Sequence, residues 1–135
     1  MNDTTMKKDI TTTEDIQLLV NTFYSRVREN EILGYVFDDV AQVNWEKHLP
    51  VMHSFWATVL FGRASFKGNP LAKHTALHER VPLTEEHFAT WLVLWHETID
   101  ELFDGKVAQS AKSKAELMKI LMLGKIQQLN TANAV

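Results

Sequence analysis

The sequence predicts a single all-α domain. Apolar residues recur at helical spacing in four long segments, and no segment shows the alternation of apolar and polar residues that marks a half-buried strand. A chain of 135 residues suits one domain with its own core. We expect a flexible tail over residues 1–10 and one domain over residues 11–135.

The first long helix is expected from about residue 12 to residue 29. Thr11 followed by Glu14 suggests a capping box, in which a hydroxyl and a carboxylate satisfy the first helical N–H groups. An apolar stripe of helical period follows, made of Ile16, Leu19, Val20, Phe23 and Val27. Beyond it, Gly34 interrupts the pattern, and residues 35–37 form a short apolar stretch before a predicted turn.

A second helix is expected from about residue 44 to residue 61. Pro50 falls inside it beside His48, so we expect a kink or a broken first turn there, because proline lacks the N–H donor. The segment from Gly62 to Pro70 has loop chemistry, and Pro70 could open a short helix that carries His74. An irregular stretch of about 20 residues is uncommon in a compact domain unless something functional, such as a prosthetic group, organises it.

Two further long helices complete the prediction. Thr84 followed by Glu85 and Glu86 marks the start of the third helix, with acidic residues at its positive end. Its apolar stripe consists of Phe88, Trp91, Leu92, Trp95, Ile99, Leu102 and Phe103. The last helix, over roughly residues 107–129, carries alanines and methionines at helical spacing.

Composition excludes several classes of function. The formal net charge of −3 argues against a general nucleic-acid binder. No apolar run approaches the roughly 18 residues of a membrane span, and no apolar stretch after Lys7 and Lys8 suggests a signal peptide. The chain has no cysteine, which removes disulfides, thiolate metal sites and cysteine nucleophiles and fits the reducing cytoplasm.

Six histidines remain for metal or acid–base chemistry. None has an acidic residue three positions before it, so the paired Glu-x-x-His motifs of a di-iron bundle are absent. His74 and His78 can share a helix face, but no His-Glu-x-x-His arrangement supplies a catalytic base. From the residues alone, Trp91 fits core packing, and His87 fits a structural role in the first turn of its helix.

Taken together, the chain resembles the truncated haemoglobins, and specifically their group III branch. The resemblance runs from about Ile16 to Phe103. It is carried by Phe23-Tyr24 with Val27, Gly34 with Phe37, Trp45-x-x-His48-Leu49, Phe55-Trp56, Gly68-Asn69-Pro70-Leu71-x-x-His74 and His87-Phe88-x-x-Trp91-Leu92. It implies a two-over-two helical sandwich around haem b, with an irregular segment before the iron-binding histidine.

Carried over position by position, the resemblance implies a site. His74 would be the proximal ligand of the iron, Tyr24 and Trp91 the distal hydrogen-bond donors, and His48 a distal histidine near the pocket mouth. The residues expected to contact or wall the haem are Phe37, Met52, Phe55 and Trp56. The chain departs from the family at Phe66, where tyrosine is frequent, and Pro50 lies close to His48.

The resemblance also implies a range of functions. The expected ligands are O₂, NO and CO, bound by a monomer in the cytoplasm that receives electrons from an unidentified reductase. Two hydrogen bonds to the ligand favour redox chemistry, such as nitric oxide dioxygenation or peroxide activation, over transport. Two alternatives stay open: a haem-based gas sensor or store without turnover, and a cofactor-free helical module that binds a partner helix in an aromatic groove.

Overall fold

The structure of the protein is a computed structural model that describes residues 7–62 and 83–133, with side chains up to residue 128. Its elements are α1 (Thr13–Glu29), α2 (Glu31–Gly34), the π-helical turn η1 (Tyr35–Val40), α3 (Trp45–Phe61), α5 (Glu85–Leu102) and α6 (Lys106–Asn133). These ranges contain no strand, so the predicted all-α class is confirmed. The short helix expected after Pro70 lies outside the described residues.

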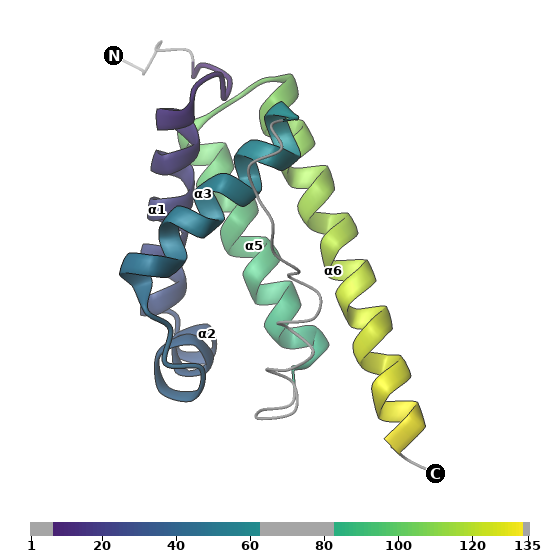
Figure 1. The fold of residues 1–135 in the computed structure, drawn as a ribbon. Helices are drawn as coiled ribbons and strands as arrows, with labels where there is room; N and C mark the ends of the chain where they lie inside the picture. The colour runs from purple at the N-terminus through teal and green to yellow at the C-terminus, as the bar shows by residue number, and fades with distance from the viewer. Residues whose placement is uncertain (1–6, 63–82, 134–135) are drawn as a thin grey trace, which may run out of the picture.

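The long helices form two pairs. Helix α1 packs on α3, α5 packs on α6, and α1 also contacts α5 and so joins the pairs. Figure 1 shows α5 and α6 side by side in opposite directions, with α3 crossing from the α2 end of the molecule toward the start of α6. This is the predicted two-over-two helical sandwich.

The start of α1 differs from the sequence prediction by one residue. The capping box is made by Thr12 and Asp15: the Asp15 N–H donates to Thr12 Oγ1 at 3.1 Å, and the Thr12 N–H donates to Asp15 Oδ2 at 3.1 Å. The Thr11 N–H also donates to the Asp15 carboxylate. Burial would raise the pKa of Asp15, but Lys8 and these N–H groups outweigh it and hold that pKa well below its usual range. The predicted pair of Thr11 and Glu14 is therefore wrong, because Asp15 can reach more donors.

The segment before α1 is packed where a flexible tail was expected. Ile10 is fully buried in the core, and Lys8 O accepts a hydrogen bond from the Asp104 N–H at 3.0 Å. Asp9 accepts hydrogen bonds from the N–H groups of Val107 and Ala108, both at 2.9 Å, at the start of α6. Residues 7–10 are thus part of the domain, and residues 1–6 lie outside the described residues.

The stretch after α1 is helical, where the sequence suggested an interruption and a turn. Asn30 Oδ1 accepts the N–H groups of Ile32 and Leu33, both at 3.0 Å, and starts α2. The chain then widens into η1, in which the Ala41 N–H donates to Val36 O at 2.9 Å, five residues back. Gly34 lies inside this helical run instead of ending it.

Helix α3 keeps its first turn in spite of Pro50. The N–H groups of Lys47 and His48 donate to Asn44 O at 3.1 and 2.8 Å, so the expected broken first turn is wrong. The missing donor of Pro50 lies beyond that turn, inside the helix. The helix ends at Gly62, whose φ of 71° is a left-handed C-cap conformation.

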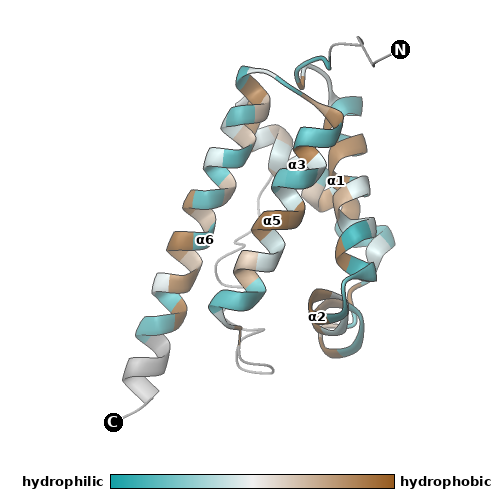
Figure 2. Ribbon diagram, turned by 180° about the vertical axis from the view of Figure 1, so that it is seen from behind, coloured by the Kyte–Doolittle hydropathy of each residue, from teal (hydrophilic) through white to brown (hydrophobic). Residues whose placement is uncertain are grey.

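The core is built around Trp95 of α5, which is fully buried. Its ring stacks on Trp56 of α3 with centroids 4.4 Å apart, and meets Phe23 of α1 edge to face at 4.9 Å. Its indole N–H donates to Ala111 O of α6 at 3.2 Å. Figure 2 shows hydrophobic residues alternating with hydrophilic ones along α1, α5 and α6, as expected for helices with one buried face.

Replacing Asp9 with alanine should lower the free energy of unfolding by about 1–2 kcal/mol, because the first N–H groups of α6 lose their acceptor. Burial raises the pKa of Asp9, but N–H groups of residues 107, 108 and 10 outweigh it and lower the pKa below its usual value. The charged form is therefore favoured by folding. The stabilisation should be complete above the unfolded pKa of about 4 and disappear as the pH falls through the folded pKa.

Urea unfolding of the wild type and the Asp9→Ala variant between pH 7 and pH 2.5 measures this effect. Asp9→Asn is the matched control, since it keeps an acceptor oxygen but cannot titrate. A difference between wild type and Asp9→Ala that stays constant over this pH range would contradict the prediction.

Candidate functional site

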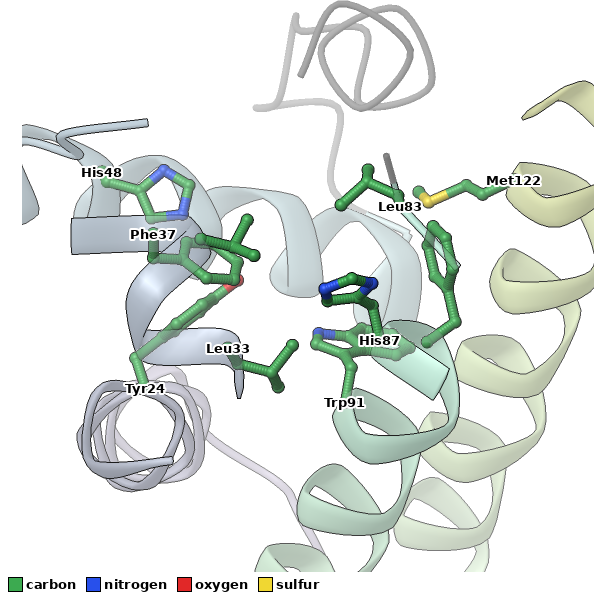
Figure 3. Close-up of a pocket in the computed structure, with 10 residues that line it drawn as sticks. Tyr24, Leu33, Phe37, His48, Leu83, His87, Trp91 and Met122 are labelled. Atoms are coloured by element: carbon green, nitrogen blue, oxygen red, sulfur yellow. The ribbon is translucent and has the colours of Figure 1, made fainter. Parts of the chain in front are cut away.

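A largely apolar cavity opens between the two helix pairs. Its volume of about 720 Å³, which includes space open to solvent, falls within the range of small-molecule sites. The described residues that line it are Tyr24, Leu33, Val36, Phe37, His48, Leu83, His87, Phe88, Trp91 and Met122. Figure 3 shows them converging from α1, the α2–η1 segment, α3, α5 and α6. One cavity is thus built from segments far apart in the sequence.

Tyr24 reaches the cavity from the buried face of α1. Its side chain is only 5% exposed, and its ring packs edge to face on Phe23 at 4.9 Å and on Phe37 at 6.0 Å. Burial raises the pKa of Tyr24 well above its usual value, so the phenol keeps its proton at neutral pH. No described residue exchanges a hydrogen bond with its hydroxyl, which leaves the proton available to a ligand in the cavity.

Trp91 supplies a second donor, from α5. The other two indole N–H groups near the site are occupied: Trp45 Nε1 donates to Asp38 Oδ1 at 2.8 Å, and Trp95 Nε1 donates to Ala111 O at 3.2 Å. The indole N–H of Trp91 has no acceptor among the described residues, and its ring lines the cavity. Phe23 meets that ring edge to face at 6.1 Å and helps to hold it. Because indole nitrogen can only donate, Trp91 suits an acceptor bound in the cavity.

His48 comes from the first turn of α3 and lies against Tyr24, with ring centroids 5.4 Å apart. Trp45 packs on both rings, at 5.5 Å from His48 and 5.3 Å from Tyr24. Asp38 fixes Trp45 through its indole, while the Arg28 guanidinium lies over the Trp45 ring at 5.0 Å and contacts the Asp38 carboxylate at 3.4 Å. This cluster packs against Tyr24 and His48 and so stabilises the part of the cavity wall that these two residues form.

The structure brings together four of the expected site residues and places three elsewhere. Tyr24, Phe37, His48 and Trp91 all line the cavity. Met52, Phe55 and Trp56 are absent from its described lining and pack against the hydrophobic core, where Phe55 meets Trp56 edge to face at 5.3 Å. Their contact with a haem remains a prediction. His74 and Phe66 lie outside the described residues.

Several lining residues were not expected from the sequence. They are Leu33, Val36, Leu83, His87, Phe88 and Met122. The spacing of His87, Phe88 and Trp91 on one helix could have revealed two of them, since residues three and four apart share a helix face. Met122 lay in a predicted core stripe of the last helix, and nothing in that stripe separates a core methionine from one that faces a cavity.

The cavity fits a large, flat, apolar group that carries a small polar ligand. Its described wall holds only four side chains with N–H or O–H groups, and the rest are aliphatic, aromatic or thioether. Two of the four, from Tyr24 and Trp91, have donors without a partner among the described residues. Haem with a bound gas has this combination of surfaces, and the helical sandwich together with this cavity defines a globin.

Comparison with known proteins agrees with this class. A match to the bacterial-like globin family covers residues 5–124, so the chain belongs to that family and is a haem-binding globin. The group 3 truncated hemoglobin ctb of Campylobacter jejuni is 28% identical over 116 residues, which cover 84% of this chain and 89% of the relative. The crystal structure of the group III truncated hemoglobin from C. jejuni matches with a TM-score of 0.78 and 26% identity, over 90% of this chain and 95% of that one. The resemblance to group III truncated haemoglobins is confirmed.

Within the described ranges, no helix combines the length and the apolar character needed to cross a bilayer.

Replacing Gly34 with alanine should destabilise the wall that carries Leu33, Val36 and Phe37. A Cβ at Gly34 would lie 2.6 Å from the backbone oxygen of Arg28, so α2 would have to move away from α1. We expect a loss of about 1–3 kcal/mol in the free energy of unfolding, as for other overpacked positions. Thermal unfolding followed by circular dichroism measures it.

Gly124→Ala on α6 is the matched control. Nothing lies within 4 Å of a Cβ at this position, and the helix there is regular. Alanine should be neutral or should stabilise the protein by up to about 1 kcal/mol. Equal effects of the two substitutions would show that the close approach at Gly34 does not matter.

Proposed function

We propose that this globin binds haem b through His74 and holds a diatomic ligand, such as O₂ or NO, against Tyr24 and Trp91. The supporting observation is a pair of donors, from α1 and α5, that have no partner among the described residues and line one cavity. His74 lies outside the described residues, and its assignment rests on the motif Gly68-Asn69-Pro70-Leu71-x-x-His74.

When bound, haem supplies an iron atom that takes a gas molecule as ligand and exchanges electrons with it. The protein supplies the surroundings. The apolar wall keeps water away, Phe37 offers a ring for packing, and His48 stands beside Tyr24. Trp91 can only donate a hydrogen bond, so it stabilises negative charge on the bound ligand. Tyr24 can both donate and accept a hydrogen bond, so it can also transfer a proton to the ligand.

The strength of this hydrogen bonding favours chemistry over transport. Each bond to a charged acceptor contributes about 1.5–3 kcal/mol, so two of them slow ligand escape by roughly 100-fold or more. A carrier needs faster release. We infer a role in removing reactive ligands: nitric oxide, O₂ and one electron from a reductase combine to nitrate, or peroxide is reduced.

A sensor or store without turnover is the alternative, and consumption of nitric oxide in the presence of a reductase separates the two. We place the protein in the cytoplasm as a monomer, which fits a chain without cysteine.

Replacing His74 with alanine should abolish the native Soret band that the wild-type chain develops with added haemin, because the iron loses its protein ligand. Absorption spectra of the ferric, ferrous and CO forms measure this. His53→Ala is the control, since His53 lies on α3 outside the cavity lining with its Nε2 2.8 Å from Asn21 Oδ1. A native spectrum in the His74→Ala variant would show that another group binds the iron.

Replacing Tyr24 or Trp91 with phenylalanine should speed O₂ dissociation by about 10-fold or more each, because each change removes one donor to the ligand. Stopped-flow displacement of O₂ by CO measures the rates. Burial keeps Tyr24 protonated, so its contribution should not change between pH 6 and pH 9.

Tyr35→Phe is the matched control. Tyr35 is 54% exposed and does not line the cavity, so loss of its hydroxyl does not affect the ligand. Dissociation rates in Tyr24→Phe and Trp91→Phe that equal that of the control would remove both residues from contact with the ligand.

A further inference from the structure

His87, which the sequence assigned a structural role, has two different environments at the edge of the cavity. Its Nδ1 lies 3.0 Å from the backbone nitrogen of Thr84, the N-cap residue of α5. A backbone N–H can only donate, so Nδ1 must be the acceptor. A neutral imidazole that accepts at Nδ1 carries its proton on Nε2. The helix cap thus makes the other edge of the ring an N–H donor.

The His87 ring forms part of the cavity wall. His87 and Trp91 lie one helical turn apart on the same side of α5, and both line the cavity. Figure 3 shows the His87 ring beside the Trp91 indole, reaching into the same space. His87 lies in the first turn of α5, one turn nearer the start of that helix than Trp91, and both side chains are half-buried. A half-buried donor in the cavity wall can reach the solvent-facing rim of a bound group.

The rim of a haem carries two carboxylates. The described lining of the cavity contains no lysine or arginine, and its N–H and O–H groups belong to Tyr24, His48, His87 and Trp91. We have assigned Tyr24 and Trp91 to the gas ligand, and His48 lies against Tyr24. His87 is the remaining donor of this set. Its two nearest charged neighbours in sequence, Glu85 and Glu86, are exposed, and as carboxylates they have no proton to donate to another carboxylate.

We propose that His87 binds a carboxylate of the haem through its Nε2–H, while Thr84 fixes the ring from the other side. This inference rests on the proposed haem-binding function.

A series of substitutions separates the cap from the carboxylate contact. Glutamine and glutamate are the usual residues at this position of a capping box, so His87→Gln and His87→Glu keep an acceptor for the Thr84 N–H, and His87→Ala loses it. Glutamine still offers an N–H, alanine offers none, and glutamate adds a negative charge. We expect melting temperatures near wild type for the first two variants and a lower one for His87→Ala.

Haem loss to an excess of a haem-free acceptor protein gives the second readout. We expect a rate near wild type for His87→Gln, about 10-fold faster for His87→Ala, and faster again for His87→Glu, since one bond to a charged group is lost and then replaced by repulsion. His96→Gln, a change on α5 outside the cavity lining, should leave the rate unchanged. Equal rates for His87→Glu and His87→Gln would overturn the proposal and leave His87 a cap alone.

The dimethyl ester of haem is the matched cofactor, because its rim carries no charged carboxylate. With the ester, the rates for His87→Glu and His87→Gln should converge. A difference that persists with the ester overturns the carboxylate contact but leaves haem binding intact. A wild-type chain that takes up neither porphyrin overturns the haem assignment itself, and this inference with it.

Discussion

The packing of Trp95 is the constraint on which the rest of the structure depends. This one side chain of α5 contacts each of the other three long helices: it stacks on Trp56 of α3, meets Phe23 of α1 and donates its indole proton to Ala111 of α6. Because the ring is fully buried and its only polar atom is satisfied, it joins the two helix pairs without leaving an unpaired donor inside.

Trp95 also sets the orientation of the site. The Trp91 ring lies parallel to it, with centroids 6.5 Å apart and an interplanar angle of 2°. Residues four apart on a helix share a face, so a ring held in the core aligns its neighbour one turn nearer the cavity. Trp91 and Trp95 look alike in sequence but differ in role. The indole N–H of Trp95 donates to the Ala111 carbonyl, whereas the ring of Trp91 lines the cavity.

The sequence predicted the long helices well, because buried faces impose a period that residues such as Ile16, Leu19 and Phe23 display directly. The two-over-two arrangement of these helices was predicted only through the resemblance to a family. It also placed Tyr24, His48 and Trp91 at one site, through the motifs shared with a family. The remaining features depend on which partner a side chain reaches in space. Asp15 in place of Glu14 as the cap, the π-helical turn after Gly34 and the contact of His87 with Thr84 are set by distances that no spacing rule contains.

The bond from Asp9 to α6 joins residues 98 positions apart in the chain. Closing so long a loop costs entropy before the contact returns any stability, so the first turn of α6 gains its cap late in folding. During synthesis the order is favourable, since Asp9 leaves the ribosome well before the helix that it caps. A circular permutant that begins at α6 would reverse this order and expose the uncapped helix first, a kinetic cost that the finished fold does not reveal.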